Sequence, residues 1–192
     1  MGQEYERKFE ATGQIHRLVQ QAFPGHWQTI AMETTYYDTP DRRLSALRCT
    51  LRRRMENGVS ICTLKTPAKG GIRGEWEIQK DTIEDAVPEL CKLSGWDTLS
   101  FLPGAPLVSI CGARFTRRAR TVPLPDCVAE LALDEGVLIG GGKESPLCEL
   151  EAELKEGSAG ALDAFARELA RRFSLEEEPV SKFRRALLLT EK

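Results

Sequence analysis

The sequence predicts an α+β domain built on an eight-stranded antiparallel β-barrel, closed or nearly closed, with a charged interior and flanking helices. Two observations support this prediction. Segments of strand length follow one another along the chain, and turns join most of them. Several of these segments also alternate charged and apolar side chains with a period of two, so each strand has one charged face and one apolar face.

Turn residues separate the predicted strands. Glu56-Asn57-Gly58 is a hairpin signal, because Asn-Gly readily adopts the positive backbone angles of a tight turn, and Lys69-Gly70-Gly71 indicates a looser turn. Strands joined in this way pair antiparallel. The predicted strands cover residues 3–10, 27–38, 47–56, 58–66, 73–80, 110–120, 126–138 and 145–155.

Four helical segments interrupt these strands. Thr82 with Asp85 three residues later is typical of a capping box. The longest helix, from Ser158 to about Arg172, carries an apolar stripe that must dock on a sheet. The other two helices are predicted at residues 12–22 and about 181–189.

Length and charge narrow the class of protein. The 192 residues suit a single domain spanning 1–192. With 27 basic and 29 acidic residues the net charge is -2, which removes the general electrostatic argument for nucleic acid or an anionic membrane as partner. No segment approaches the ~20 apolar residues of a membrane span, and no leader pattern opens the chain. We therefore expect a soluble cytoplasmic protein, with a homodimer as one possible assembly.

Cysteine and histidine usage argues against a zinc site. The six cysteines form no CxxC pair and the chain has only two histidines. We expect most cysteines to be reduced, buried thiols, and His16 and His26 to be plain surface residues.

The opening strand shows the charge pattern most clearly. Glu4, Glu6 and Lys8 project from one face, and Tyr5 and Arg7 from the other. Taken alone, this pattern is typical of a solvated sheet face. Other strands repeat it, however, with charged faces that carry Arg52 and Arg54, Lys65, Arg73 with Glu75 and Glu77, Glu130 with Asp134, and Glu149 with Glu151 and Glu153.

If helices cover the apolar faces, these charged faces converge inside the barrel. Eight strands leave an interior wide enough for side chains and one small ligand. Charges buried there must pair with one another or with a ligand, and a polyanion with a divalent metal satisfies both signs. The alternative is a sandwich whose charged faces point to water.

The ordered motifs resemble the CYTH superfamily, also called triphosphate tunnel metalloenzymes, over nearly the whole chain. The N-terminal ExExK signature is Glu4, Glu6 and Lys8. Further matches follow in order: Tyr36-Tyr37-Asp38-Thr39-Pro40, Leu51-Arg52-Arg53-Arg54, Thr63-Leu64-Lys65, Arg73-Gly74-Glu75-Trp76-Glu77, Glu130 to Gly136, Glu149 to Glu153, and Ser181 to Arg185. One departure is Phe115, at a position where many relatives carry a lysine before the arginine that matches Arg117.

The resemblance implies a tunnel that binds a triphosphate with a divalent metal. Arginine binds phosphate oxygens bidentately and lysine acts as a point charge. The expected phosphate ligands are Lys8, Arg52, Arg54, Lys65, Arg73, Arg117, Lys182 and Arg185, of which the first four are the expected catalytic residues. Mg²⁺ or Mn²⁺ prefers carboxylate and phosphate oxygens. The expected metal ligands are Glu4, Glu6, Asp134, Glu149, Glu151 and Glu153, with Glu130 as a further candidate; at least one of the three β-strand glutamates 149, 151 and 153 should instead pair with a basic residue.

The expected activity is metal-dependent hydrolysis of inorganic triphosphate to diphosphate and phosphate, as in bacterial inorganic triphosphatases. Water attacks the terminal phosphate while the metal and the arginines stabilise the developing charge. Thiamine triphosphatase and class IV adenylate cyclase are alternatives within the superfamily. A noncatalytic polyphosphate-binding module is an alternative of another class.

Overall fold

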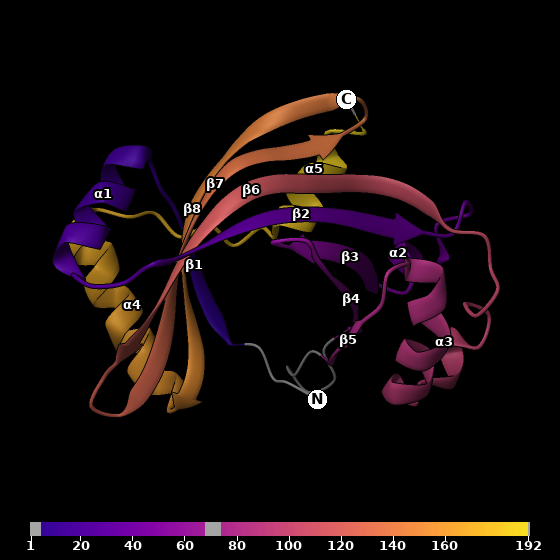
Figure 1. The fold of residues 1–192 in the computed structure, drawn as a ribbon, viewed down its shortest axis with the longest axis horizontal. Helices are drawn as coiled ribbons and strands as arrows, with labels where there is room; N and C mark the ends of the chain where they lie inside the picture. Colours follow the sequence, from indigo (N-terminus) through magenta and orange to yellow (C-terminus); the bar gives the residue numbers. More distant parts are fainter. Residues whose placement is uncertain (1–4, 68–73, 192) are drawn as a thin grey trace.

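Eight strands form one antiparallel sheet in the computed structural model, which describes residues 5–67 and 74–191 (Figure 1). The sheet order is β1-β8-β7-β6-β2-β3-β4-β5. The strands are β1 (Glu6–Glu10), β2 (Gln28–Asp38), β3 (Thr50–Glu56), β4 (Val59–Lys65), β5 (Glu75–Gln79), β6 (Val108–Pro123), β7 (Cys127–Gly140) and β8 (Lys143–Gly157). Within the described ranges no backbone pairing joins β5 to β1, so the predicted barrel is a curled, nearly closed sheet.

Five α-helices accompany the sheet in the described part of the chain. They are α1 (Gly13–Ala22), α2 (Arg43–Ala46), α3 (Ile83–Ser94), α4 (Ala159–Phe173) and α5 (Lys182–Leu188), with a 3₁₀ turn η1 (Asp97–Leu99). The sequence does not predict α2 or η1. The third predicted strand therefore starts at Thr50 rather than at residue 47.

Helices cover the apolar outer faces of the sheet, as the strand periodicity predicts. α1 and α4 pack together on β7 and β8, where Leu131 and Leu150 meet Leu162 in one core cluster (Figure 1). α3 packs on β4 and β5 around Leu64 and Leu90 in a second cluster. The charged faces of these strands consequently turn to the concave side.

α5 occupies the concave side. It packs under the long arched strands β6 and β7 (Figure 1), where Ala186 joins Met32, Phe115 and Leu138 in a third cluster. Ser181 caps this helix, and its Oγ accepts a hydrogen bond from the backbone N–H of Arg184 at 3.2 Å. The helix thus brings basic residues of its first turn into the sheet's interior.

The predicted turn and cap signals are confirmed. Asn57 and Gly58 have φ values of 48° and 87°, which are the positive angles that an Asn-Gly hairpin requires. The Oγ of Thr82 accepts from the backbone N–H of Asp85 at 3.2 Å and begins α3. The predicted turn at residues 69–71 lies outside the described residues.

A short segment after α4 pairs with the free edge of β1. The N–H of Glu10 donates to the carbonyl of Glu176 and the N–H of Glu178 donates to the carbonyl of Lys8, both at 2.9 Å. A β-bridge joins Phe9 to Glu177. The two ends of the described chain are therefore tied together next to the concave face.

The expectation for His16 was wrong. His16 is 1% exposed, and its Nε2 lies 2.9 Å from the carbonyl oxygen of Glu149. His16 faces β8 because α1 packs on that strand. The hydrogen bond to Glu149 offsets part of the cost of burying a polar imidazole on an otherwise apolar helix face. Burial lowers the pKa of His16. His26 is exposed as expected, and all six cysteines are free thiols, four of them buried.

Candidate active site

A cavity of about 420 Å³ lies on the concave side of the sheet. Eight basic residues line it, against three acidic ones. Because the whole chain carries a net charge of -2, this excess of positive charge is local. The lining basic residues are Lys8, Arg48, Arg52, Arg54, Lys65, Arg117, Lys182 and Arg184, and the acidic residues are Glu6, Glu151 and Glu153.

One wall of the cavity comes from β3 and β4. Arg52 and Arg54 are two residues apart on β3 and project from the same face, and Thr50, directly before them on that face, pairs with Lys65 of β4. Acids contact each of these cations: the ammonium of Lys65 lies 3.1 Å from Glu75 of β5, and Arg54 lies 2.5 Å from Glu56 of β3. The guanidinium of Arg52 lies 3.4 Å from Glu77, and that of Arg54 lies 3.7 Å from the same carboxylate.

Burial disfavours the charged forms of two basic residues beside the cavity. Burial, together with the neighbouring guanidinium of Arg52, lowers the pKa of Arg54. Burial likewise lowers the pKa of Lys8 on β1. An anion placed between these groups would offset both effects, so the wall suits a multiply charged anion.

The opposite side of the cavity rests on a buried ion cluster of β6, β7, β8 and α5. Arg117 donates to both carboxylate oxygens of Asp134, at 2.8 and 2.7 Å, and to Glu151 at 2.5 Å. The ammonium of Lys182 lies 2.9 Å from Asp134 and 2.5 Å from Glu151, and it also contacts Glu149. Asp134 and Glu149 have 0% exposure, so they lie behind the cavity lining.

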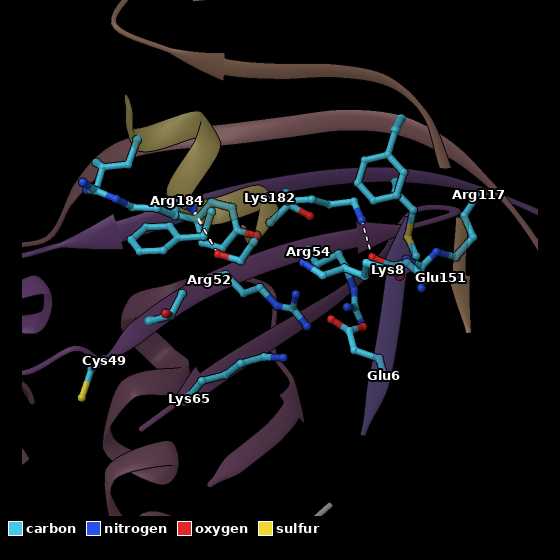
Figure 2. A pocket seen from close by; sticks show the side chains of 18 of the residues that line it. Glu6, Lys8, Cys49, Arg52, Arg54, Lys65, Arg117, Glu151, Lys182 and Arg184 are labelled. Atoms are coloured by element: carbon cyan, nitrogen blue, oxygen red, sulfur yellow. Dashed lines mark hydrogen bonds and ion pairs between the residues drawn. The ribbon is translucent and has the colours of Figure 1, made fainter. Parts of the chain in front are cut away.

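Electrostatics fixes the charge state of this cluster. Burial alone would raise the pKa of Glu151, but Lys182 and Arg117 outweigh it and lower that pKa to about 2. Burial would lower the pKa of Lys182, and Glu151 and Asp134 raise it instead. Glu151 therefore stays ionised and Lys182 stays charged, and the two side chains lie together beside the cavity in Figure 2.

Carboxylate oxygens of Asp134, Glu149 and Glu151 lie within 4.8 Å of one another, close enough to hold a metal ion. Three cations already neutralise them, because Arg185 contacts Glu149 in addition to the Arg117 and Lys182 pairs. Adding a divalent ion here would require one of those cations to leave. These contacts hold Arg117 and Lys182 in place, and the same three carboxylates stay candidate metal ligands.

Two other carboxylates face each other at the rim of the cavity. Glu6 of β1 is the direct cross-strand partner of Glu153 of β8, and both line the cavity. Like charges in this position repel unless a cation lies nearby, and Lys155 contacts Glu153 at 2.9 Å. Paired carboxylates beside a phosphate-sized cavity fit a hard divalent cation.

Comparison with known proteins decides the family. The family model described as the CYTH domain matches residues 2–187. The chain belongs to the CYTH family. An inorganic triphosphatase of Haemophilus influenzae is 32% identical over 167 residues, which cover 86% of this chain and 47% of that protein. The chain thus spans about half the length of this curated relative.

Solved structures agree with the CYTH fold. A Hippeastrum protein, described as an adenylyl cyclase candidate with a dominant triphosphatase activity, superposes with a TM-score of 0.66 at 19% identity, covering 100% of this chain and 97% of that one. The PH1819 protein of Pyrococcus horikoshii superposes with a TM-score of 0.62 at 22% identity, covering 98% of this chain and 99% of that one. At these identities the neighbours establish the fold alone.

The CYTH fold gathers most of the predicted site residues around one cavity. Six predicted phosphate ligands and three predicted metal ligands line it: Lys8, Arg52, Arg54, Lys65, Arg117 and Lys182, with Glu6, Glu151 and Glu153. Asp134 and Glu149 lie beneath them, and Glu130 lies 3.4 Å from Lys155. Arg185 does not line the cavity, because it contacts Glu149 and lies 3.1 Å from Glu178. Glu4 and Arg73 lie outside the described residues.

Phe115 is buried in the cavity wall, and the ammonium of Lys182 lies 5.5 Å from its ring centre. The ammonium group of Lys182, on α5, therefore lies beside Phe115 of β6, the position at which many relatives carry a lysine. This contact is a cation–π interaction, which also anchors the Lys182 side chain.

Sequence reasoning assigned no role to several residues around the cavity. Glu75 and Glu77 share the face of their strand that meets Arg52, and the predicted β4–β5 pairing could have identified them as counter-ions. Arg48 and Arg184 also line the cavity. Arg48 falls within the predicted strand 47–56, but in the structure it follows the unpredicted helix α2 and lies outside β3, so strand periodicity does not place it.

Proposed function

We propose that this CYTH domain, taken as one unit over residues 1–192, hydrolyses inorganic triphosphate to diphosphate and phosphate with Mg²⁺ or Mn²⁺. The observation that carries the proposal is the cavity with eight basic and three acidic lining residues. A compact polyanion with a divalent cation matches both sets of charges. The Haemophilus relative, named an inorganic triphosphatase, supports the choice of substrate.

Basic residues on both sides of the cavity would bind the phosphates. Arg52 and Arg54 offer bidentate guanidinium contacts, and their loose pairs with Glu77 at 3.4 and 3.7 Å can exchange for phosphate oxygens. Lys65 and Lys8 add point charges, while Arg117 and Lys182 present groups held by the buried acids. The terminal phosphate is thereby oriented for in-line attack by water.

Glu6 and Glu153 would hold the divalent cation, with Glu4 as a further proposed ligand and Glu151 nearest behind them. When bound, the cation supplies charge neutralisation on the phosphate oxygens and on the leaving diphosphate. Water adds to the terminal phosphorus as its bond to the bridging oxygen breaks, and diphosphate leaves. The arginines stabilise the negative charge on the transferred group.

A substrate panel tests this proposal. Purified protein is incubated with Mg²⁺ or Mn²⁺ and, separately, with tripolyphosphate, thiamine triphosphate and ATP, and free phosphate and cyclic AMP are measured. We expect phosphate from tripolyphosphate. No phosphate under either metal would refute the proposal, and tight binding without turnover would support a noncatalytic module.

Replacing Glu6 by glutamine should remove metal-dependent turnover and weaken Mn²⁺ binding measured by calorimetry without substrate. The physical reason is the loss of one anionic oxygen ligand from a site with few of them. Glu10→Gln is the matched control. Glu10 lies on the same strand and the same face as Glu6, two residues after Lys8, and its side chain is exposed. Unchanged Mn²⁺ affinity in Glu6→Gln would remove Glu6 from the metal site.

A second candidate function follows from the apolar part of the cavity. Met32, Tyr36, Phe115, Phe183 and Leu187 line it beside the charged residues. Such a wall suits an organic group attached to the triphosphate, as in thiamine triphosphate or ATP. The thiamine triphosphate and ATP arms of the panel test this candidate directly.

A further inference from the structure

The outer face of β1 is held by a single carboxylate of α4. The hydroxyl of Tyr5 donates to the carboxylate of Asp163, whose two oxygens lie 3.0 and 2.9 Å away. The Nε of Arg7 donates to the same carboxylate at 2.7 Å, and the Nη2 of Arg7 donates to the Tyr5 hydroxyl at 2.9 Å. Tyr5, Arg7 and Asp163 therefore form a closed triangle of hydrogen bonds.

This triangle brackets Glu6. Side-chain direction alternates along a strand, so Tyr5 and Arg7 point outward to α4 while Glu6 between them points to the concave side. Glu6 and Lys8 line the cavity (Figure 2), and Asp163 is not among the described residues that do. Asp163 thus contacts both chain neighbours of a proposed metal ligand from the opposite side of the sheet.

Backbone pairing secures β1 unevenly. β8 pairs along the whole strand, from Glu6 opposite Glu153 to Glu10 opposite Glu149. On the other edge, the backbone bonds from the segment at residues 176–178 reach Glu10 and Lys8. In the described part of the chain, the half of β1 that carries Glu6 therefore has a backbone partner on one edge only.

Hydrophobic patterning does little to set the register of β1. The strand reads Glu-Arg-Lys-Phe-Glu, so Phe9 is its one apolar side chain. Register is strongly specified where one face of a strand is apolar and buried, and weakly where both faces are polar. A slip of one residue would turn Glu6 and Lys8 to the outer face. In either direction of slip, Glu6 would take the place of Tyr5 or of Arg7 beside Asp163.

Charge makes such a slip unfavourable. The hydrogen bond from Arg7 lowers the pKa of Asp163, so this carboxylate stays ionised. A slip would replace its hydrogen-bond donors by the carboxylate of Glu6, and two like charges in contact repel. Asp163 therefore favours the native register in two ways: it binds the residues that flank Glu6, and it repels Glu6 itself.

We propose that Asp163 is a positioning residue for the metal site, which fixes the register and backbone of β1 so that Glu6 faces Glu153 at the cavity rim. This inference rests on the proposed function, because it takes Glu6 and Glu153 as ligands of the divalent cation. Asp163 acts through β1 alone, whereas the arginines of the cationic wall belong to β3. Its loss should therefore weaken metal binding more than phosphate binding.

The test compares these two affinities. Calorimetry gives the Kd of Mn²⁺ without substrate and the Kd of tripolyphosphate in EDTA, for the wild type and for Asp163→Asn. We expect the Kd of Mn²⁺ to rise about tenfold, as is typical when a group that orients a metal ligand is lost. The Kd of tripolyphosphate should stay within about threefold, because β3 and β4 supply most of its proposed contacts.

Glu168→Gln is the matched control. Glu168 also lies on α4 and also accepts from an arginine, Arg171, at 3.0 and 2.7 Å, but this pair is exposed and lies within the helix. The control should leave the Kd of Mn²⁺ within about twofold. Asp163→Glu keeps the charge that binds Arg7 and repels Glu6. Its Kd for Mn²⁺ should lie closer to that of the wild type than to that of Asp163→Asn.

Tyr5→Phe is a milder variant that leaves the carboxylate in place. It removes one donor of the triangle, so the Kd of Mn²⁺ should rise about threefold. If Asp163→Asn does not fold, wild-type Mn²⁺ affinity in Tyr5→Phe would overturn the positioning role.

The outcomes separate this inference from the proposed function. A wild type that binds no Mn²⁺ would overturn the proposed metal site and this inference with it. Mn²⁺ binding that weakens in Glu6→Gln but not in Asp163→Asn would overturn the positioning role alone. An equal rise of both Kd values in Asp163→Asn, or an equal loss of Mn²⁺ affinity in Glu168→Gln, would also overturn it.

Discussion

The two charged sides of the cavity hold their ions in different ways. On the β7–β8 side, Asp134, Glu151 and their cations are buried and closely paired, at 2.5 to 2.9 Å. On the β3–β5 side, Arg52 and Arg54 meet Glu77 at 3.4 and 3.7 Å, and that carboxylate is 41% exposed, although Arg54 also pairs with Glu56 at 2.5 Å. A buried, neutralised cluster fixes geometry, whereas loose pairs can change partner. We therefore assign support to the first side and substrate exchange to the second.

The largest expected effect comes from breaking the buried cluster. Asp134→Asn removes one of the two carboxylates that Arg117 and Lys182 share and leaves Glu151 alone between them. The free energy of unfolding should fall by about 3–5 kcal/mol, measured by urea denaturation. Glu135→Gln is the control, because Glu135 lies on the opposite face in an exposed pair with Arg118 and should cost less than about 1 kcal/mol. Equal losses would remove the distinction between the two sides.

A substitution among the arginines of the β3–β5 side should affect activity rather than stability. Arg54→Gln removes a guanidinium that lines the cavity, and kcat/KM for tripolyphosphate should fall about 10²- to 10³-fold with little change in melting temperature. Arg53→Gln is the control, since Arg53 projects to the outer face and its Nε donates to Ser60 at 2.9 Å. Comparable activity in the two variants would argue against phosphate binding by Arg54.

Stability measured at acid pH should reveal the contribution of Glu151 to the buried cluster on the β7–β8 side. The pKa of Glu151 falls from 4.5 to about 2 in the folded protein, so its stabilising contribution is present above about pH 4.5 and is lost as the pH falls toward 2. Urea denaturation of the wild type should show this loss between pH 5 and pH 2. Glu151→Gln should be less stable at pH 5 and should lose less stability on acidification. Parallel curves would contradict the assignment.

The smallest effect should come from Glu77, the acid that competes for Arg52 and Arg54. Glu77→Gln removes a partly exposed carboxylate from a loose pair, so stability should change by less than about 1 kcal/mol. Calorimetry should show tripolyphosphate binding about two- to fivefold more tightly, because a competing anion is gone. Weaker binding would mean that Glu77 orients the arginines instead of competing with the phosphate.

Local pattern was sufficient to predict the strands and the inner faces. The alternation of Leu150 with Glu151 assigns one residue to the helix layer and the other to the interior, because side-chain direction in a strand has a period of two. The hairpin at Asn57-Gly58 needed no tertiary information either, because the turn angles depend on those two residues.

Tertiary contacts determine the positions of three side chains that the sequence pattern did not predict. Arg185 shares a helix turn with Lys182, yet it turns to Glu149 and Glu178 rather than to the cavity. His16 is buried only because α1 docks on β8. Arg48 reaches the cavity through a loop whose shape depends on the carboxylate of Asp38, seven residues from its farthest partner. Glu149 is far along the chain from His16 and Arg185, whereas Asp38 and Ser45 are only seven residues apart but lie in a loop that no periodic pattern predicts.

The pairing of the segment at residues 176–178 with β1 also affects the order in which the domain folds. Lys8 and Lys182 are 174 residues apart in the sequence, and the hydrogen bond from the N–H of Glu178 to the carbonyl of Lys8 holds their segments side by side. A chain that has folded only through α4 therefore has the sheet but not the assembled cavity. Contacts of such long sequence separation form late. The domain should acquire its phosphate affinity in a single step, when the segment at residues 176–188 docks after most of the core is in place.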